Sequence, residues 1–95
     1  MNRVVLITTE GCEGCNIMKR IVSTAYLDAK VENVSFGQYD FREREVEDIV
    51  KDNNISDFPT TLFIKENKVI DKIIGTRTKE EIINKIKTFE TVNVG

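Results

Sequence analysis

The sequence has no histidine, no tryptophan, one proline and only two cysteines among its 95 residues. Structural zinc takes four ligands, nearly always Cys and His, so Cys12 and Cys15 cannot complete such a site within one chain. A metal or iron–sulfur site would need a second Cys-X-X-Cys pair from another copy, or an external thiol. A metal-bridging dimer therefore stays open as a less favoured interpretation of the two cysteines.

The sequence also lacks a long apolar run and an excess of either charge. Fourteen basic and sixteen acidic residues give a net charge of −2 with no basic block, so we expect no binding to nucleic acid or anionic lipid. The first ten residues lack the long apolar stretch of a signal peptide, and no run reaches the roughly 20 apolar residues of a membrane span. We expect a cytoplasmic protein in a reducing environment, where structural disulfides are rare.

The composition that remains is that of a small globular domain. Apolar residues make up 40% of the chain and charged residues 32%, which is typical of a folded protein. The length suits a single compact domain. We predict one domain over residues 1–90, a loose tail over residues 91–95, and a monomer.

Hydrophobic periodicity and turn signals predict an α/β fold with the order β-α-β-α-β-β-α. The predicted elements are strands at 3–8 and 34–41, helices at 15–27 and 42–52, strands at 61–64 and 68–74, and a last helix from Thr78. Glu66-Asn67 suits a two-residue hairpin turn, and Thr78 with Glu81 forms a capping-box pattern. The first βαβ unit gives parallel strands and the hairpin adds an antiparallel one. We predict a mixed four-stranded sheet with helices on both faces.

Cys12 and Cys15 fall at the junction between the first strand and the first helix. Free backbone N–H groups and the helix dipole stabilise a thiolate there, and thiol pKa values in this setting fall below about 8.5. Gly11 and Gly14 leave room for a partner chain. We predict a redox-active dithiol in which Cys12 is the nucleophile and Cys15, one helical turn on, is the resolving thiol. Two inert buried cysteines are a less favoured alternative.

The single proline, Pro59, precedes the strand at 61–64. At the start of a strand a proline removes no essential ladder hydrogen bond. Most X–Pro bonds in folded proteins are trans, so this residue alone does not predict a cis bond.

Taken together, the segments resemble the thioredoxin superfamily over nearly the whole chain. The resemblance rests on Thr8 to Cys15 with the following helix, on Phe58-Pro59-Thr60-Thr61-Leu62-Phe63-Ile64, and on Lys68 to Gly75 with the last helix. The chain resembles a minimal form that lacks the first strand and helix of full thioredoxins. This family carries a cis proline against the cysteine pair, which implies that Phe58 and Pro59 contact the substrate. It also implies disulfide-containing protein substrates, a thioredoxin reductase-like electron donor and no cofactor.

The active-site motif departs from the family pattern. Gly11 replaces the usual Trp before Cys12, and Glu13-Gly14 stands between the cysteines in place of a sequence with Pro. The buried acid that assists proton transfer in thioredoxins aligns with Leu6, so that proton route is missing. Water or Glu13 is left for this role, although Glu13 is equally explained as an exposed residue of the first helical turn.

Two further classes of function stay open beside a thioredoxin-like reductase. A glutaredoxin-like protein would use glutathione, but Phe58 before the proline and the turn Gly75 to Lys79 are closer to the thioredoxin pattern. Lys19 and Arg20 would suit an anion, but they also fit the exposed face of a helix. A non-catalytic module that binds partner chains is the other class.

Overall fold

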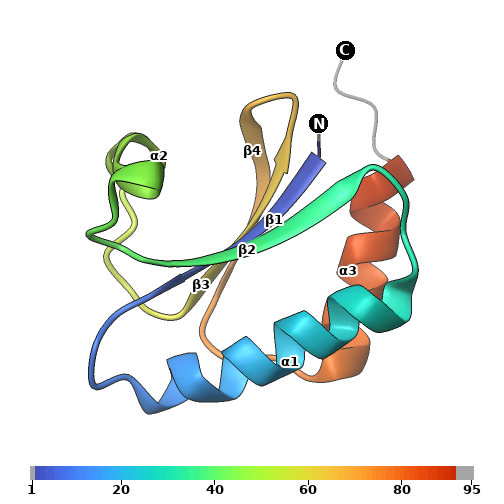
Figure 1. Cartoon of the computed structure of the whole chain (residues 1–95), viewed down its shortest axis with the longest axis horizontal. Helices are drawn as coiled ribbons and strands as arrows, with labels where there is room; N and C mark the ends of the chain where they lie inside the picture. Colours follow the sequence, from blue (N-terminus) through green and yellow to red (C-terminus); the bar gives the residue numbers. More distant parts are fainter. Residues whose placement is uncertain (1, 92–95) are drawn as a thin grey trace.

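A mixed four-stranded sheet forms the centre of the protein in a computed structural model, which describes residues 2–91 (Figure 1). The strand order is β2-β1-β3-β4. β1 (Asn2–Thr8) pairs in parallel with β2 (Val34–Asp40) and antiparallel with β3 (Thr60–Lys65). β4 (Lys68–Ile74) extends the sheet as an antiparallel neighbour of β3. The predicted topology is confirmed.

Helices cover both faces of this sheet, as predicted. α1 (Glu13–Ala29) and α3 (Lys79–Thr91) lie together on one face, and the short helices η1 (Arg44–Val46) and α2 (Glu47–Asp52) lie on the other (Figure 1). Between residues 2 and 91, no helix is long and apolar enough to cross a membrane.

The central strand divides the core into two halves by strand alternation. Val4 and Leu6 pack in the cluster beneath α1 and α3, whereas Val5 and Ile7 pack in the cluster beneath α2. All four side chains are fully buried. A strand covered on both faces must be apolar throughout, which explains the uninterrupted run at the start of the sequence.

Two local signals act as the sequence predicts. The Thr78 hydroxyl accepts the Glu81 N–H at 3.2 Å and lies 3.2 Å from the Glu81 carboxylate, so α3 begins directly after Thr78. Glu66 and Asn67 both have positive φ, 51° and 66°, and they form the turn between β3 and β4.

The second predicted helix is shorter than expected. Residues 42–52 were predicted to be helical throughout, but the α-helix proper begins at Glu47. The Asp40 carboxylate accepts the Arg42 N–H at 2.9 Å, and the Glu43 carboxylate accepts the Asp40 N–H at 2.6 Å. These side-chain bonds hold a turn in place of the first helical turn. At the other end of the chain, α3 includes Thr91, and residues 92–95 of the predicted tail lie outside the described residues.

Candidate active site

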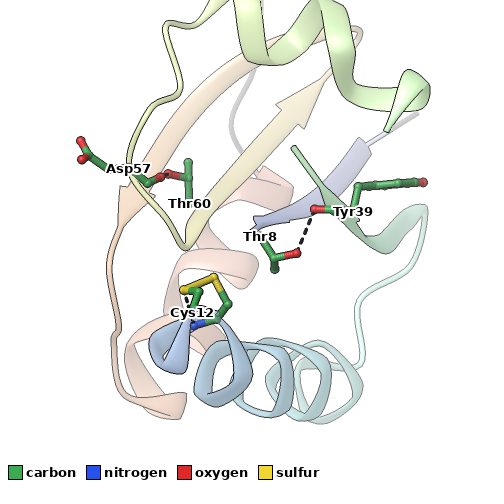
Figure 2. The surroundings of a disulfide bond; sticks show 6 residues. Thr8, Cys12, Tyr39, Asp57 and Thr60 are labelled. Atoms are coloured by element: carbon green, nitrogen blue, oxygen red, sulfur yellow. Dashed lines mark hydrogen bonds between the residues drawn. A yellow bond between two sulfur atoms is a disulfide. The ribbon is translucent and has the colours of Figure 1, made fainter. Parts of the chain in front are cut away.

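Cys12 is the N-cap residue of α1, one position before the helix begins. Its Sγ accepts the backbone N–H of Cys15 at 3.0 Å, and the two sulfurs form a disulfide bond (Figure 2). Gly11 has a φ of +65°, the left-handed conformation that glycine adopts at little cost. A sulfur at this position lies at the positive end of the helix dipole, which favours a thiolate when the disulfide is reduced.

The two cysteines differ in their access to solvent. Cys12 is partly exposed and lines an open hollow of about 340 Å³ between the β1–α1 loop, α1 and the end of β2. Cys15 is only 1% exposed. A partner disulfide approaching the surface would therefore meet Cys12 first.

Pro59 lies against the segment that joins the two cysteines. The Phe58–Pro59 peptide bond is cis, as in the family that the sequence resembles. A Cβ added to Gly14 would lie 3.3 Å from Pro59 Cδ and 3.5 Å from Thr76 Cγ2, so a larger residue would crowd this contact. The Pro59 carbonyl accepts the Gly75 N–H at 2.8 Å. The fold thus brings together the cysteine pair and the proline that are 44 residues apart in sequence.

Two threonine hydroxyls fix the chain on either side of the cysteine pair (Figure 2). The Thr8 hydroxyl donates to the Tyr39 carbonyl at 3.3 Å and joins the ends of β1 and β2. The Thr60 hydroxyl donates to the Asp57 carbonyl at 2.6 Å and closes the turn that contains Pro59. Both hydroxyls are committed to structure.

The sequence did not predict a contact between the Pro59 loop and the loop before Cys12. The Phe58 ring packs on the Phe41 ring with centroids 5.0 Å apart, and the Arg42 guanidinium lies 5.6 Å from the centre of the Phe41 ring. Arg42 also pairs with Glu10 at 3.0 Å, two residues before Cys12. The aromatic residues at 41 and 58 were visible in the sequence, but their pairing depends on the tertiary fold.

Arg42 also sets the ionisation of its neighbour Asp40. The side-chain hydrogen bond from Arg42 lowers the pKa of Asp40 below 3.8, and the backbone N–H of Arg42 acts in the same direction. The same contact with Asp40, followed by that with Glu10, raises the pKa of Arg42. Asp40 therefore stays a carboxylate and Arg42 a cation at neutral pH.

Neither candidate for the missing proton route is buried beside the sulfurs. Leu6, which aligns with the buried acid of thioredoxins, is fully buried in the apolar cluster under α1. Glu13 is an exposed residue of the first turn of α1. Residues 2–91 contain no group of three or more His, Cys, Asp or Glu side chains placed to hold a metal ion.

A cysteine pair at a helix N-terminus, packed against a cis proline on a mixed sheet, defines the thioredoxin-fold class of redox proteins. Residues 2–88 match the sequence model of the family Thioredoxin, so the chain belongs to this family. Its active-site pair is a thioredoxin-like redox pair. A search of curated proteins found no match.

Solved structures with the same fold include three thioredoxins. Mitochondrial thioredoxin 3 from Saccharomyces cerevisiae, in its oxidized form, is 24% identical with a TM-score of 0.72, covering 92% of this chain and 77% of that one. Reduced desulfothioredoxin from Desulfovibrio vulgaris Hildenborough is 20% identical with a TM-score of 0.75, covering 92% and 80%. Thioredoxin-2 of the malaria parasite is 12% identical with a TM-score of 0.76, covering 93% and 82%. At these identities the likeness concerns the fold.

Proposed function

We propose that the protein reduces disulfide bonds of partner proteins through a Cys12/Cys15 dithiol. The observation that carries the proposal is the asymmetry of the pair, because Cys12 is partly exposed at the helix N-cap and Cys15 is 1% exposed. Such an arrangement suits one sulfur for attack on an external disulfide and the other for an internal second step.

In the first step, the Cys12 thiolate attacks one sulfur of the partner disulfide. A bond forms between Cys12 and that sulfur, and the partner's other sulfur leaves as a thiolate that takes a proton from solvent. The Cys15 N–H, which lies 3.0 Å from Cys12 Sγ in the oxidised protein, is placed to stabilise the attacking thiolate. Phe58 and Pro59 are the proposed contacts for the partner chain beside this bond.

In the second step, Cys15 loses its proton and its sulfur attacks Cys12. The Cys12–Cys15 disulfide forms, the bond to the partner breaks, and the partner's second sulfur departs and is protonated. The partner has gained two electrons and two protons, and the protein holds the oxidised pair. A thioredoxin reductase-like donor is the proposed source of electrons for the return to the dithiol.

The proposed setting is the cytoplasm, where the dithiol would be kept reduced, and the proposed active form is a monomer. A single active site per chain fits this form, because both cysteines and Pro59 come from one chain. Cell fractionation tests the location. Sedimentation of the reduced protein tests the oligomeric state.

Insulin-disulfide reduction tests the proposed reaction directly. We expect catalysed reduction when NADPH and a thioredoxin reductase regenerate the dithiol, and little when glutathione is the only reductant. Faster turnover with glutathione would instead identify a glutaredoxin-like enzyme. A chain that binds oxidised insulin without reducing it under either condition would be a binding module. Stoichiometric zinc or iron in the purified protein would favour the metal-bridging alternative.

A further inference from the structure

One buried polar group lies near the active site without a partner. Thr61, the second residue of β3, is fully buried, and its hydroxyl has no hydrogen-bond partner among residues 2–91. An unsatisfied buried hydroxyl destabilises a fold, and native proteins carry few of them. A valine of nearly the same shape would avoid that cost. The presence of a hydroxyl at this position therefore requires an explanation.

The sheet register places Thr61 in the layer directly under the cysteine pair. Thr61 lies opposite Leu6 on β1, and strand alternation puts it on the same face as Phe63, beneath α1 and α3. It follows Pro59 by two residues, and Pro59 packs against the first turn of α1. Cys15 is the first buried residue of that helix. The unpartnered hydroxyl and the buried sulfur thus belong to the same end of the same interface.

We propose that the Thr61 hydroxyl is the hydrogen-bond donor to Cys15 Sγ when Cys15 is not in the disulfide. Thr61 is then a positioning residue for the second step of the proposed reaction, and the inference rests on that reaction. A disulfide sulfur is a weak acceptor, whereas a thiolate is a strong one. The hydroxyl is therefore without a partner in the oxidised protein and gains one in the mixed disulfide.

The second step explains why such a donor is useful. Cys15 must lose its proton before its sulfur attacks Cys12, and burial disfavours the thiolate. The proton is passed to the partner's departing sulfur, so that one S–S bond forms as another breaks and no further reactant is required. With Leu6 at the position of the family's buried acid, the Thr61 hydroxyl supplies a neutral donor from the neighbouring strand. It stabilises the thiolate and does not accept the proton.

Stopped-flow oxidation by Ellman's reagent separates the two steps. Attack by Cys12 releases the first thionitrobenzoate, and attack by Cys15 on the resulting mixed disulfide releases the second. We expect Thr61→Val to leave the first phase unchanged and to move the pH profile of the second phase upward by about one unit, as for loss of one hydrogen bond to a charged group. At pH 7 the second phase should slow about threefold, because a thiol of higher pKa is partly compensated by greater nucleophilicity. Thr61→Ser should restore the wild-type profile.

Thr60→Val is the matched control, since Thr60 is also buried on β3 but its hydroxyl is bonded to Asp57. We expect both of its phases to match the wild type. Titration of Cys15 in a Cys12→Ser background, with and without Thr61→Val, should show the same upward pKa shift of about one unit. An unchanged second phase and an unchanged Cys15 titration in Thr61→Val would overturn the inference. Failure of the wild-type protein to release a second equivalent would instead contradict the proposed dithiol reaction.

Discussion

The two cysteines occupy environments different enough to be distinguished by trapping. Cys15→Ser leaves the partly exposed Cys12 able to attack a partner but removes the sulfur that releases it. We expect this variant to accumulate a covalent mixed disulfide with oxidised insulin, visible on a non-reducing gel and lost on addition of dithiothreitol. Cys12→Ser leaves only a sulfur that is 1% exposed, so it should trap little partner. Equal trapping by the two variants would contradict the assigned roles.

Thr61 links chemistry to stability at the scale of one side chain. In the oxidised protein its hydroxyl is buried without a partner, so Thr61→Val should raise the free energy of unfolding by about 1 kcal/mol. Thr61→Ser keeps the hydroxyl and loses a methyl group, so it should show no such gain. Denaturant unfolding of the oxidised proteins measures both values. A lower stability for Thr61→Val would mean that the hydroxyl already has a partner in the folded oxidised state.

At the scale of elements, the turn between β2 and η1 contains a titrating group beside the active site. Asp40 at the end of β2 bonds Arg42, which lowers the Asp40 pKa below 3.8. A carboxyl with a depressed pKa stabilises the fold above its ordinary pKa, and this contribution is lost as pH falls through the folded value. Asp40→Asn should therefore be less stable than the wild type at pH 7, and the difference should shrink as pH is lowered below about 4.

Arg42→Gln is the companion variant, because it removes the main cause of the Asp40 shift without removing the carboxyl. Its stability should vary less with pH below about 4 than that of the wild type, as for Asp40→Asn. Chemical denaturation across the acid range gives these slopes. The same acid dependence in the wild type and both variants would show that other carboxylates, such as Asp71 beside Lys85, dominate.

Elements governed by local signals could be predicted from the sequence, and those governed by side-chain bonds could not. The apolar run of β1 and the Thr78 capping box depend on neighbours close in sequence, so their patterns are direct. The position of Cys12 at a helix N-terminus followed from the strand–helix junction. The helix predicted from Arg42 begins later because Asp40 and Glu43 bond the backbone of the turn, which no periodicity signals.

Within the site, the cysteine pair and Pro59 were identifiable as motifs, but their surroundings were not. The Phe41–Phe58 contact joins residues from separate loops, and it exists only once the sheet has placed those loops together. Thr61 reads in the sequence as an ordinary β-branched strand residue. Its unpartnered hydroxyl becomes apparent only when the register sets it opposite Leu6 under α1.

At the scale of the whole molecule, the redox state of the pair should alter the stability of the entire fold. Domains of this size have a modest margin of stability, and the Cys12–Cys15 bond closes a loop between residues three apart. In the chain-entropy description, such a short cross-link destabilises the unfolded chain by about 2 kcal/mol. Stabilisation of a Cys12 thiolate by the helix N-terminus favours the reduced fold and offsets part of this amount.

We therefore expect the oxidised protein to be more stable than the reduced protein by about 1 to 2 kcal/mol at pH 7. Urea unfolding of the two forms measures the difference. Thermodynamic linkage then requires the folded pair to have a reduction potential about 20 to 40 mV more negative than the same pair in the unfolded chain. Redox titration in buffer and in denaturant gives the second quantity independently. A reduced form equal to or more stable than the oxidised form would mean that thiolate stabilisation in the folded site exceeds the effect of the cross-link.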